Sequence, residues 1–208
     1  WKTPKTNVCL QIDTPIAYAT PGNAALTKMF MNILEEKVNE ISYYADCAGL
    51  YFNCGSSAQG IYMNFHGYSH KLSVLMDRVL DMVCTIRNPG ACDDALYERL
   101  KSKMLQDYSN QKFAQPYRQC VTGSARCLSH PVHTAEQKHF FLETCSSIDF
   151  ESFASKLLLQ VHVTAFVHGN ATPAESREIT NSVCEKLNVS PLPSATLLYH
   201  QRAMDLLP

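Results

Sequence analysis

The sequence lacks the charge and hydropathy features of a nucleic-acid-binding or membrane-spanning protein. Its 208 residues carry a formal net charge of −1 without any run of five like charges, so composition indicates no binding to nucleic acid or to an anionic membrane. The longest apolar runs are short, such as the leucines at 157–159, and no transmembrane helix is predicted. The opening residues, WKTPKTNV, lack a signal-peptide core. We expect a domain cut from a longer protein.

Common catalytic motifs are also absent. No HExxH, GxSxG, P-loop or GxGxxG pattern occurs, and these are the short patterns that mark zinc, serine-nucleophile and nucleotide sites. Serine and histidine are plentiful, but no spacing indicates a nucleophile–base pair. His162 and His168 lie at even spacing on a predicted strand, which indicates an exposed or half-exposed row rather than metal ligands. The sequence therefore predicts no catalytic centre in this chain.

Cysteine is abundant, with nine residues and no CxxC pair. Several, such as Cys84 and Cys184, lie among apolar residues at helical spacing, where free cysteine behaves as a small hydrophobic side chain. An odd, scattered set favours a reducing location over a disulfide framework. We therefore expect a cytoplasmic protein. Charged residues make up 18%, below the roughly 25% usual for soluble domains, which favours a surface that is partly covered by a partner of some kind.

Hydrophobic periodicity predicts alternating strands and helices. Val8, Leu10 and Ile12 alternate with polar residues and indicate a strand that ends by Pro15. A turn is expected at Pro21-Gly22, with Asn23 as the N-cap of a long helix that stops at Gly49. LYFNC and GIYMNFH are predicted to form a hairpin, and VHVTAFVHGN a further strand. The remaining predicted helices cover 70–86, Asp93 or Asp94 to Ala114, Pro116 to Leu128, a short segment after Thr134, SIDFESFASKLLLQ, and Thr172 to Leu187.

This order of elements predicts an α+β fold. Two strands joined by a tight turn must be antiparallel, and the helices occur in runs, so we expect a two-layer sandwich in which an antiparallel or mixed sheet carries helices packed on one face. One domain is expected over residues 1–187. Residues 188–208 are interrupted by prolines and are predicted to form a linker with an edge strand toward a following domain.

The stretch ADCAGLYFNCGSSAQGIYMNFHGYSH contains a near-miss to a zinc-finger spacing. Its candidate ligands are Cys47, Cys54, His66 and His70. Successive strand residues point to opposite faces, so if the apolar rows face the helices, Cys54 points into the core and His66 to the other face. Ligands on opposite faces cannot converge tetrahedrally on one ion, and side-chain direction therefore argues against zinc here.

A second near-miss is the segment His133-Thr-Ala-Glu136-Gln137. Inverted zinc peptidases use H-x-x-E-H on a helix, but here glutamine takes the last position and His139 falls two residues late. We interpret Thr134 as an N-cap and Gln137 as its partner in a capping box.

Small and aromatic residues around the hairpin resemble a known family. The pattern is Y-A-x-x-A-G-L, a strand with G-x-Y, then G-Y-x-x-K before a helix, and the matching residues are Tyr44, Ala45, Ala48, Gly49, Leu50, Gly60, Tyr62, Gly67, Tyr68 and Lys71. Three further segments match in order, namely TPIAY at 14–18, QP at 115–116 and HGN at 168–170 followed by Thr172. Over about residues 3–190 the chain resembles the third domain of insulin-degrading-enzyme-type peptidases, the pitrilysin or inverzincin family.

That resemblance implies a polypeptide of four related α+β domains, whose two halves close around a chamber where peptides are cleaved. Zinc and the H-x-x-E-H site belong to the first domain of such enzymes. Substrate-orienting residues of the C-terminal half lie mainly in the fourth. The resemblance thus implies that this chain holds no catalytic residue and no metal ligand, and that its partners are the other domains and peptide substrates.

One face of the predicted hairpin is the candidate functional surface. We expect it to face the chamber or a neighbouring domain, although a plain solvated sheet face would have the same polar character. Its residues are Tyr51, Asn53, Tyr62, Asn64 and His66. Two alternatives to a peptidase domain stay open: a non-peptidase scaffold like the processing-peptidase subunits and respiratory-complex core proteins, and an independent metal-binding module.

Overall fold

A computed structural model describes residues 3–88, 90, 92–193, 196 and 202–204. A five-stranded mixed sheet, in the order β2-β3-β1-β5-β6, forms one layer. Its strands are β1 (Lys5–Asp13), β2 (Leu50–Ser56), β3 (Gly60–Tyr68), β5 (Gln160–Gly169) and β6 (Ser190–Pro191). The first four pair antiparallel, and β6 pairs parallel with β5.

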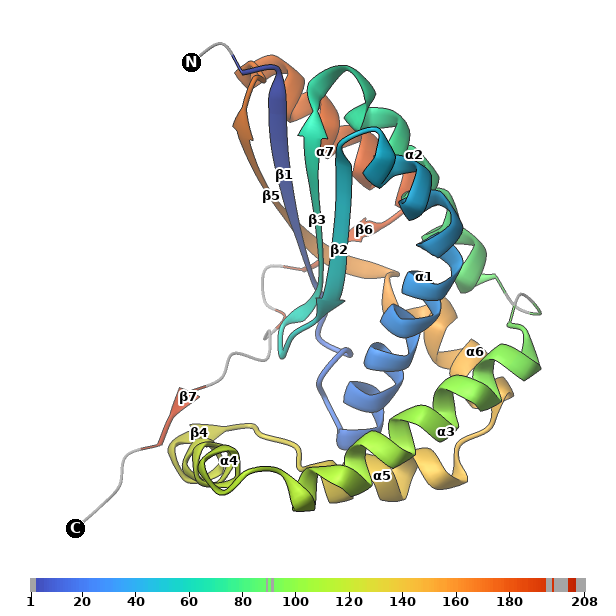
Figure 1. Cartoon of the computed structure of the whole chain (residues 1–208), viewed down its shortest axis with the longest axis vertical. Coiled ribbons are helices and arrows are strands. Elements are labelled where there is room, and N and C mark those ends of the chain that lie inside the picture. Colours follow the sequence, from blue (N-terminus) through green and yellow to red (C-terminus); the bar gives the residue numbers. More distant parts are fainter. Residues whose placement is uncertain (1–2, 89, 91, 194–195, 197–201, 205–208) are drawn as a thin grey trace.

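Helices cover one face of this sheet and leave the other open (Figure 1). The helices are α1 (Pro21–Cys47), α2 (Ser69–Arg87), α3 (Asp94–Asn110), α4 (Pro116–Leu128), α5 (Ala135–Thr144), α6 (Ser147–Leu157) and α7 (Pro173–Leu187). Helices α1, α2 and α7 pack on the strands, whereas α3 and α5 pack on α1 beyond the end of the sheet. The α+β class and the one-sided packing of helices are confirmed.

The core lies between the sheet and its helices. In β1 the alternating side chains Val8, Leu10 and Ile12 are at most 1% exposed, and the alternating apolar residues of β3 join them. Each helix adds an apolar stripe at three- and four-residue spacing, for example Met29, Phe30 and the other buried residues of α1. Apolar burial of this kind is the main favourable term in folding.

The start of α1 differs from the prediction. Thr20, and not Asn23, is the N-cap, because the Thr20 hydroxyl accepts a hydrogen bond from the Asn23 backbone N–H at 3.1 Å. Pro21 lies in the first helical turn, where proline loses no hydrogen bond, so the predicted turn at Pro21-Gly22 was wrong. Gly49 follows the helix with φ of 72°, as predicted for a helix stop.

Other helix ends follow local signals closely. Asp93 caps α3, but this helix ends at Asn110 and a short 3-10 turn, Gln111–Phe113, replaces its predicted last residues. The capping box predicted at Thr134 with Gln137 is present, and Thr172 with Glu175 forms another at the start of α7. Pro116 begins α4 as expected.

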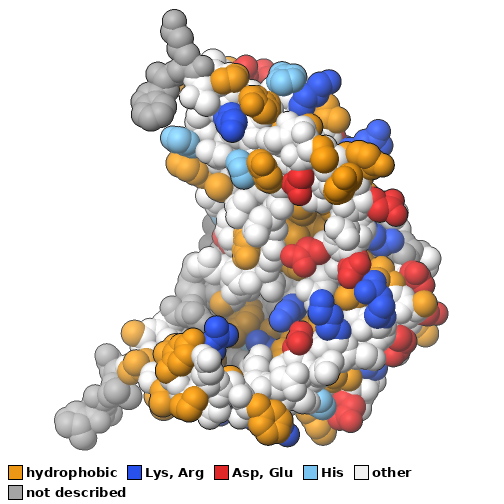
Figure 2. Space-filling model, in the orientation of Figure 1, with side chains coloured by type: hydrophobic (Ala, Val, Ile, Leu, Met, Phe, Trp, Pro, Cys, Tyr) orange, Lys and Arg blue, Asp and Glu red, His pale blue; other side chains and the backbone are white. Residues whose placement is uncertain are grey.

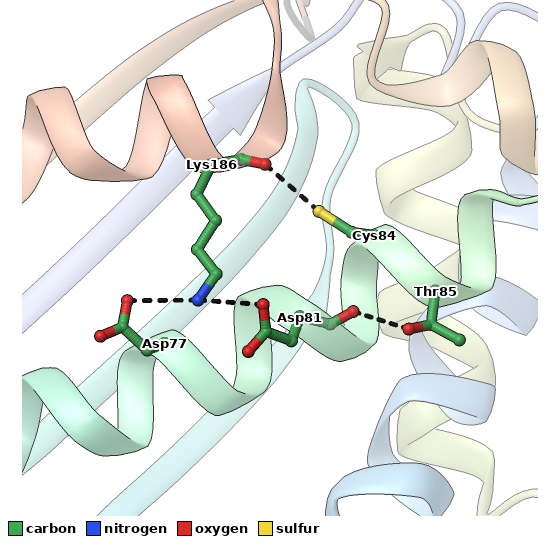
Figure 3. A network of polar contacts seen from close by, with 5 residues as sticks. All are labelled: Asp77, Asp81, Cys84, Thr85 and Lys186. Carbon is green, nitrogen blue, oxygen red and sulfur yellow. Dashed lines mark hydrogen bonds and ion pairs between the residues drawn. The ribbon is translucent and has the colours of Figure 1, made fainter.

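Polar contacts hold the C-terminal end of α7 against α2 (Figure 3). The Lys186 ammonium lies 3.3 Å from an Asp77 carboxylate oxygen and 3.0 Å from one of Asp81. The Cys84 thiol donates to the Lys186 carbonyl at 3.4 Å, and the Arg87 guanidinium donates to the Leu187 carbonyl at 2.6 Å. Burial acts to lower the pKa of Lys186, but its hydrogen bonds to Asp81 and Asp77 outweigh this and raise it.

The last segment is only partly described. Strand β6 lies at the edge of the sheet, and β7 (Arg202–Ala203) pairs with β4 (Ser129–His130), which follows α4. The predicted linker role of residues 188–208 rests largely on positions outside the described residues, so it stays a prediction.

Candidate functional site: the open face of the sheet

The open face of the sheet is built by side chains that alternate with the core residues. Strand register places Tyr51 opposite His66, and Asn53 opposite Asn64. On its other side β3 pairs with β1, where Asn7 lies opposite His66 and Cys9 lies opposite Asn64. Because residues opposite one another in adjacent strands share a face, these positions form continuous polar rows across the sheet.

The five residues predicted from the hairpin all lie on this face. The rings of Tyr51 and His66 stack with centroids 4.5 Å apart, and Tyr51 is 44% exposed. Asn53 and His66 are exposed, whereas Tyr62 and Asn64 are half-buried. The structure thus groups all five on one surface.

Two strands that sequence reasoning did not connect to the hairpin extend the same face. Asn7, Cys9 and Gln11 come from β1, which pairs with β3 on one side and β5 on the other. Strand β5 adds Thr164, Phe166 and His168, and the rings of Phe166 and His168 stack at 6.3 Å. The period-two alternation of these strands was visible in the sequence; their adjacency was not, because it depends on topology.

The side chains of this face can bind a ligand through hydrogen bonds and apolar contacts. Amide, phenol and imidazole groups can donate and accept hydrogen bonds, and Tyr and Phe add apolar contact area. Phe166 is 63% exposed and adds an accessible aromatic ring to the β5 row. The outline of the molecule is concave on this side, between the sheet and the lower helices (Figure 2).

The residues present do not fit a zinc ion. Burial, together with the charge of Glu35, raises the pKa of the Cys54 thiol to about 12, whereas zinc is bound by thiolate. Cys54 is 5% exposed in the core, and His66 lies on the opposite face. Among the described residues no group of three or more His, Cys, Asp or Glu side chains could hold a metal ion.

The near-miss H-x-x-E-H segment has a structural role. The His133 ring packs against the Tyr18 ring with centroids 4.5 Å apart, and its Nε2 lies 2.9 Å from the Tyr18 carbonyl oxygen. Gln137 closes the capping box with Thr134. These contacts attach the start of α5 to the loop after β1.

Within the described part of the chain, no helix is both long and apolar enough to cross a bilayer.

Sequence comparison relates the chain to a peptidase family. A family model described as the middle or third domain of peptidase M16 matches residues 1–139. The chain is similar to the peroxisomal insulin-degrading enzyme-like 1 of Arabidopsis thaliana, with 26% identity over 94% of this chain and 20% of that protein. It spans about a fifth of the length of the curated relatives that it matches.

Two solved structures share the fold. The crystal structure of pitrilysin aligns with a TM-score of 0.79 and 19% identity, over 89% of this chain and 19% of that one. The structure of a peptidase M16 inactive domain from Pseudomonas fluorescens aligns with a TM-score of 0.68 and 17% identity, over 93% of this chain and 48% of that one.

Proposed function

The chain belongs to the family formed by the middle or third domain of peptidase M16, and on this premise we propose that it is a non-catalytic domain of a larger zinc-dependent metalloendopeptidase. In this proposal its open sheet face forms part of the wall of an enclosed chamber in which peptides are cleaved. Its remaining surface contacts other domains of the same polypeptide.

The observation that carries this proposal is the character of the open face. It has hydrogen-bonding and aromatic side chains in continuous rows, yet its residues do not fit a metal ion. A wall of this kind supplies binding energy remote from the reacting bond, which positions a substrate without performing chemistry.

Zinc and the catalytic residues are assigned, in this proposal, to the first domain of the parent protein. The chain by itself is then inactive, and its partners are the other domains and the peptide substrate, with neither nucleic acid nor membrane involved. A cytoplasmic location stays a proposal that rests on the nine free cysteines; the name of the Arabidopsis relative places that protein in the peroxisome.

Kinetic measurements on the complete parent protein test whether the open sheet face contacts the peptide substrate. We expect Tyr62→Ala and His66→Ala to raise KM for several peptides by about three- to tenfold with a smaller change in kcat, since they remove contacts made in both the ground and transition states. The matched control is Val74→Ala, an exposed residue on α2 at 53% exposure and away from the open face. Unchanged kinetics for every peptide would mean that the face is merely solvated.

A second candidate is a scaffold without peptidase activity, because one structural neighbour is described as an inactive domain. The residues that precede this chain in its parent protein distinguish the two. An H-x-x-E-H motif there, with a glutamate further along, supports the peptidase. A parent without that motif would be a scaffold.

A further inference from the structure

A pocket of about 260 Å³ lies at the junction of four parts of the fold. The loop after β1, the start of α1, the turn of the β2–β3 hairpin and the α3–α5 layer meet there (Figure 1). Its lining is rich in potential donors, namely Lys28, Lys138, Tyr108, Ser56 and Gln111. It borders the end of the polar rows, where Gln11 of the open face donates to the Ser57 hydroxyl of the pocket at 3.5 Å. The two lysines come from α1 and α5 and not from the sheet, so anion binding here is tested separately from the proposed function.

Two ammonium groups share this pocket without a compensating acid. The Lys28 ammonium lies 5.7 Å from the centre of the Tyr108 ring, and the Lys138 ammonium 5.7 Å from the Tyr18 ring. No Asp or Glu is among the described residues that line the pocket, and neither lysine takes part in a described salt bridge. Burial lowers the pKa of Lys138, and the nearby charge of Lys28 lowers it further.

Tyr108, one of the residues that line this pocket, has an unsatisfied buried hydroxyl. Tyr108 is only 6% exposed, and its hydroxyl is the one buried side-chain polar atom of the described residues without a hydrogen-bond partner. Burial, with a smaller effect from Asp107, raises the pKa of this hydroxyl to about 12. At neutral pH it is therefore protonated and can donate a hydrogen bond. Leaving such a group unpaired costs free energy, and buried polar groups in native proteins are nearly always paired.

We propose that this pocket binds a small oxyanion, such as inorganic phosphate or a carboxylate group. An oxyanion accepts hydrogen bonds from the two ammonium groups and from the Tyr108 hydroxyl, which removes the repulsion between the lysines and satisfies the phenol in one step. The volume lies just below the range of about 300–1,000 Å³ typical of pockets for drug-sized ligands, and so fits a small anion.

Calorimetric titration of the 208-residue chain tests this site. Sodium phosphate, sodium sulfate and sodium acetate are titrated separately at constant ionic strength, which separates phosphate-like from carboxylate ligands. We expect saturable binding that weakens by about tenfold in Lys28→Gln and in Lys138→Gln, because each variant removes one charge-assisted donor. Lys28→Arg, which keeps the charge, should retain most of the affinity. The matched control is Lys71→Gln, an exposed lysine on α2, with affinity unchanged.

Tyr108→Phe separates anion binding from a purely structural role. Without ligand, this variant should unfold at the same temperature as the unsubstituted 208-residue chain or at a higher one, because it removes an unpaired buried hydroxyl. With phosphate it should bind several-fold more weakly and gain less thermal stability from the ligand. The proposal is overturned if none of the three anions binds saturably, or if binding is unaffected by all three of Lys28→Gln, Lys138→Gln and Tyr108→Phe.

Discussion

The face of the sheet toward which a side chain points determines how exposed and how reactive that side chain is. Asn53 and Cys54 are neighbours in β2, yet Asn53 is exposed on the open face and Cys54 is 5% exposed in the core. A thiol with a pKa of about 12 is almost fully protonated near neutral pH, and a protonated thiol is a poor nucleophile and a poor metal ligand. The same alternation leaves Cys9 exposed on the open face.

Thiol alkylation provides a prediction at this scale. At pH 8 the native chain should react with iodoacetamide quickly at its exposed cysteines and at least about tenfold more slowly at Cys54 and Cys145, which are buried and whose pKa values burial raises. Peptide mass spectrometry over time measures each site. In urea all nine sites should react at similar rates. Fast native labelling of Cys54 would contradict its place in the core. The exposed sites for comparison are Cys9, Cys47, Cys120 and Cys127.

Two glycines of the family-like motif have physical reasons to be glycine. Gly49 takes φ of 72° after α1, a conformation that strains residues with a Cβ. A Cβ at Gly60 would collide with the backbone carbonyl of Ile12, on the neighbouring strand. Such requirements are local or nearly so, which explains why the motif identifies the fold even though it contains no catalytic group.

Individual helices are held by their caps as well as by their apolar stripes. At the start of α7 the Glu175 carboxylate accepts hydrogen bonds from the backbone N–H and the hydroxyl of Thr172. These bonds favour the ionised form and lower the pKa of Glu175 below its usual value of 4.5. The stabilisation is therefore complete above the usual pKa and is lost as the pH falls through the lower folded value.

Acid unfolding measures this cap. Between about pH 5 and pH 3, the free energy of unfolding of the parent chain should fall more steeply than that of Glu175→Gln, because glutamine cannot gain a proton in this range. Urea titrations at each pH give the two curves. The matched control is Glu178→Gln, an exposed glutamate in the same helix, which should follow the parent. If the unfolding free energies of the unsubstituted chain and of Glu175→Gln fall in parallel with pH, the Glu175 cap makes no contribution to the pH dependence of stability.

The whole molecule depends on long-range pairing through β1. This strand lies between β3 and β5, and its register with β5 runs from Thr6 opposite Gly169 to Asp13 opposite His162. The core also includes Phe150 of α6 and Leu187 of α7, which are at most 1% exposed. The family model matches residues 1–139, but the structural unit continues through β5 and α7.

Truncation tests where the folding unit ends. A chain that ends at residue 139 loses β5 and exposes the buried face of β1 and α1 to water, so we expect it to lose cooperative thermal unfolding. A chain that ends at residue 193 keeps β5, α7 and β6 and should unfold cooperatively like the parent. Circular dichroism at increasing temperature distinguishes them. A cooperative unfolding transition in the shorter chain would show that residues 1–139 fold without β5.

Much of the fold was predictable because its determinants are short in range. Alternation marked β1 and the hairpin, three- and four-residue spacing marked the helices, and capping residues located the starts of α5 and α7. The errors lay at helix ends: Thr20 and not Asn23 caps α1, α3 ends at Asn110, and α6 ends at Leu157 instead of continuing to Gln160. The five hairpin residues of the candidate face were also predictable, since parity along a strand needs no knowledge of topology.

The sequence by itself determined the family, the element order, the α+β class and the direction of each strand side chain, because these depend on local periodicity and turn chemistry. The tertiary structure alone decided that β1 and β5 extend the open face, and that Lys28, Tyr108 and Lys138 meet in one pocket. The physical reason is distance along the chain. Contacts between residues tens of positions apart are selected by the packing of the whole core, which no local pattern encodes.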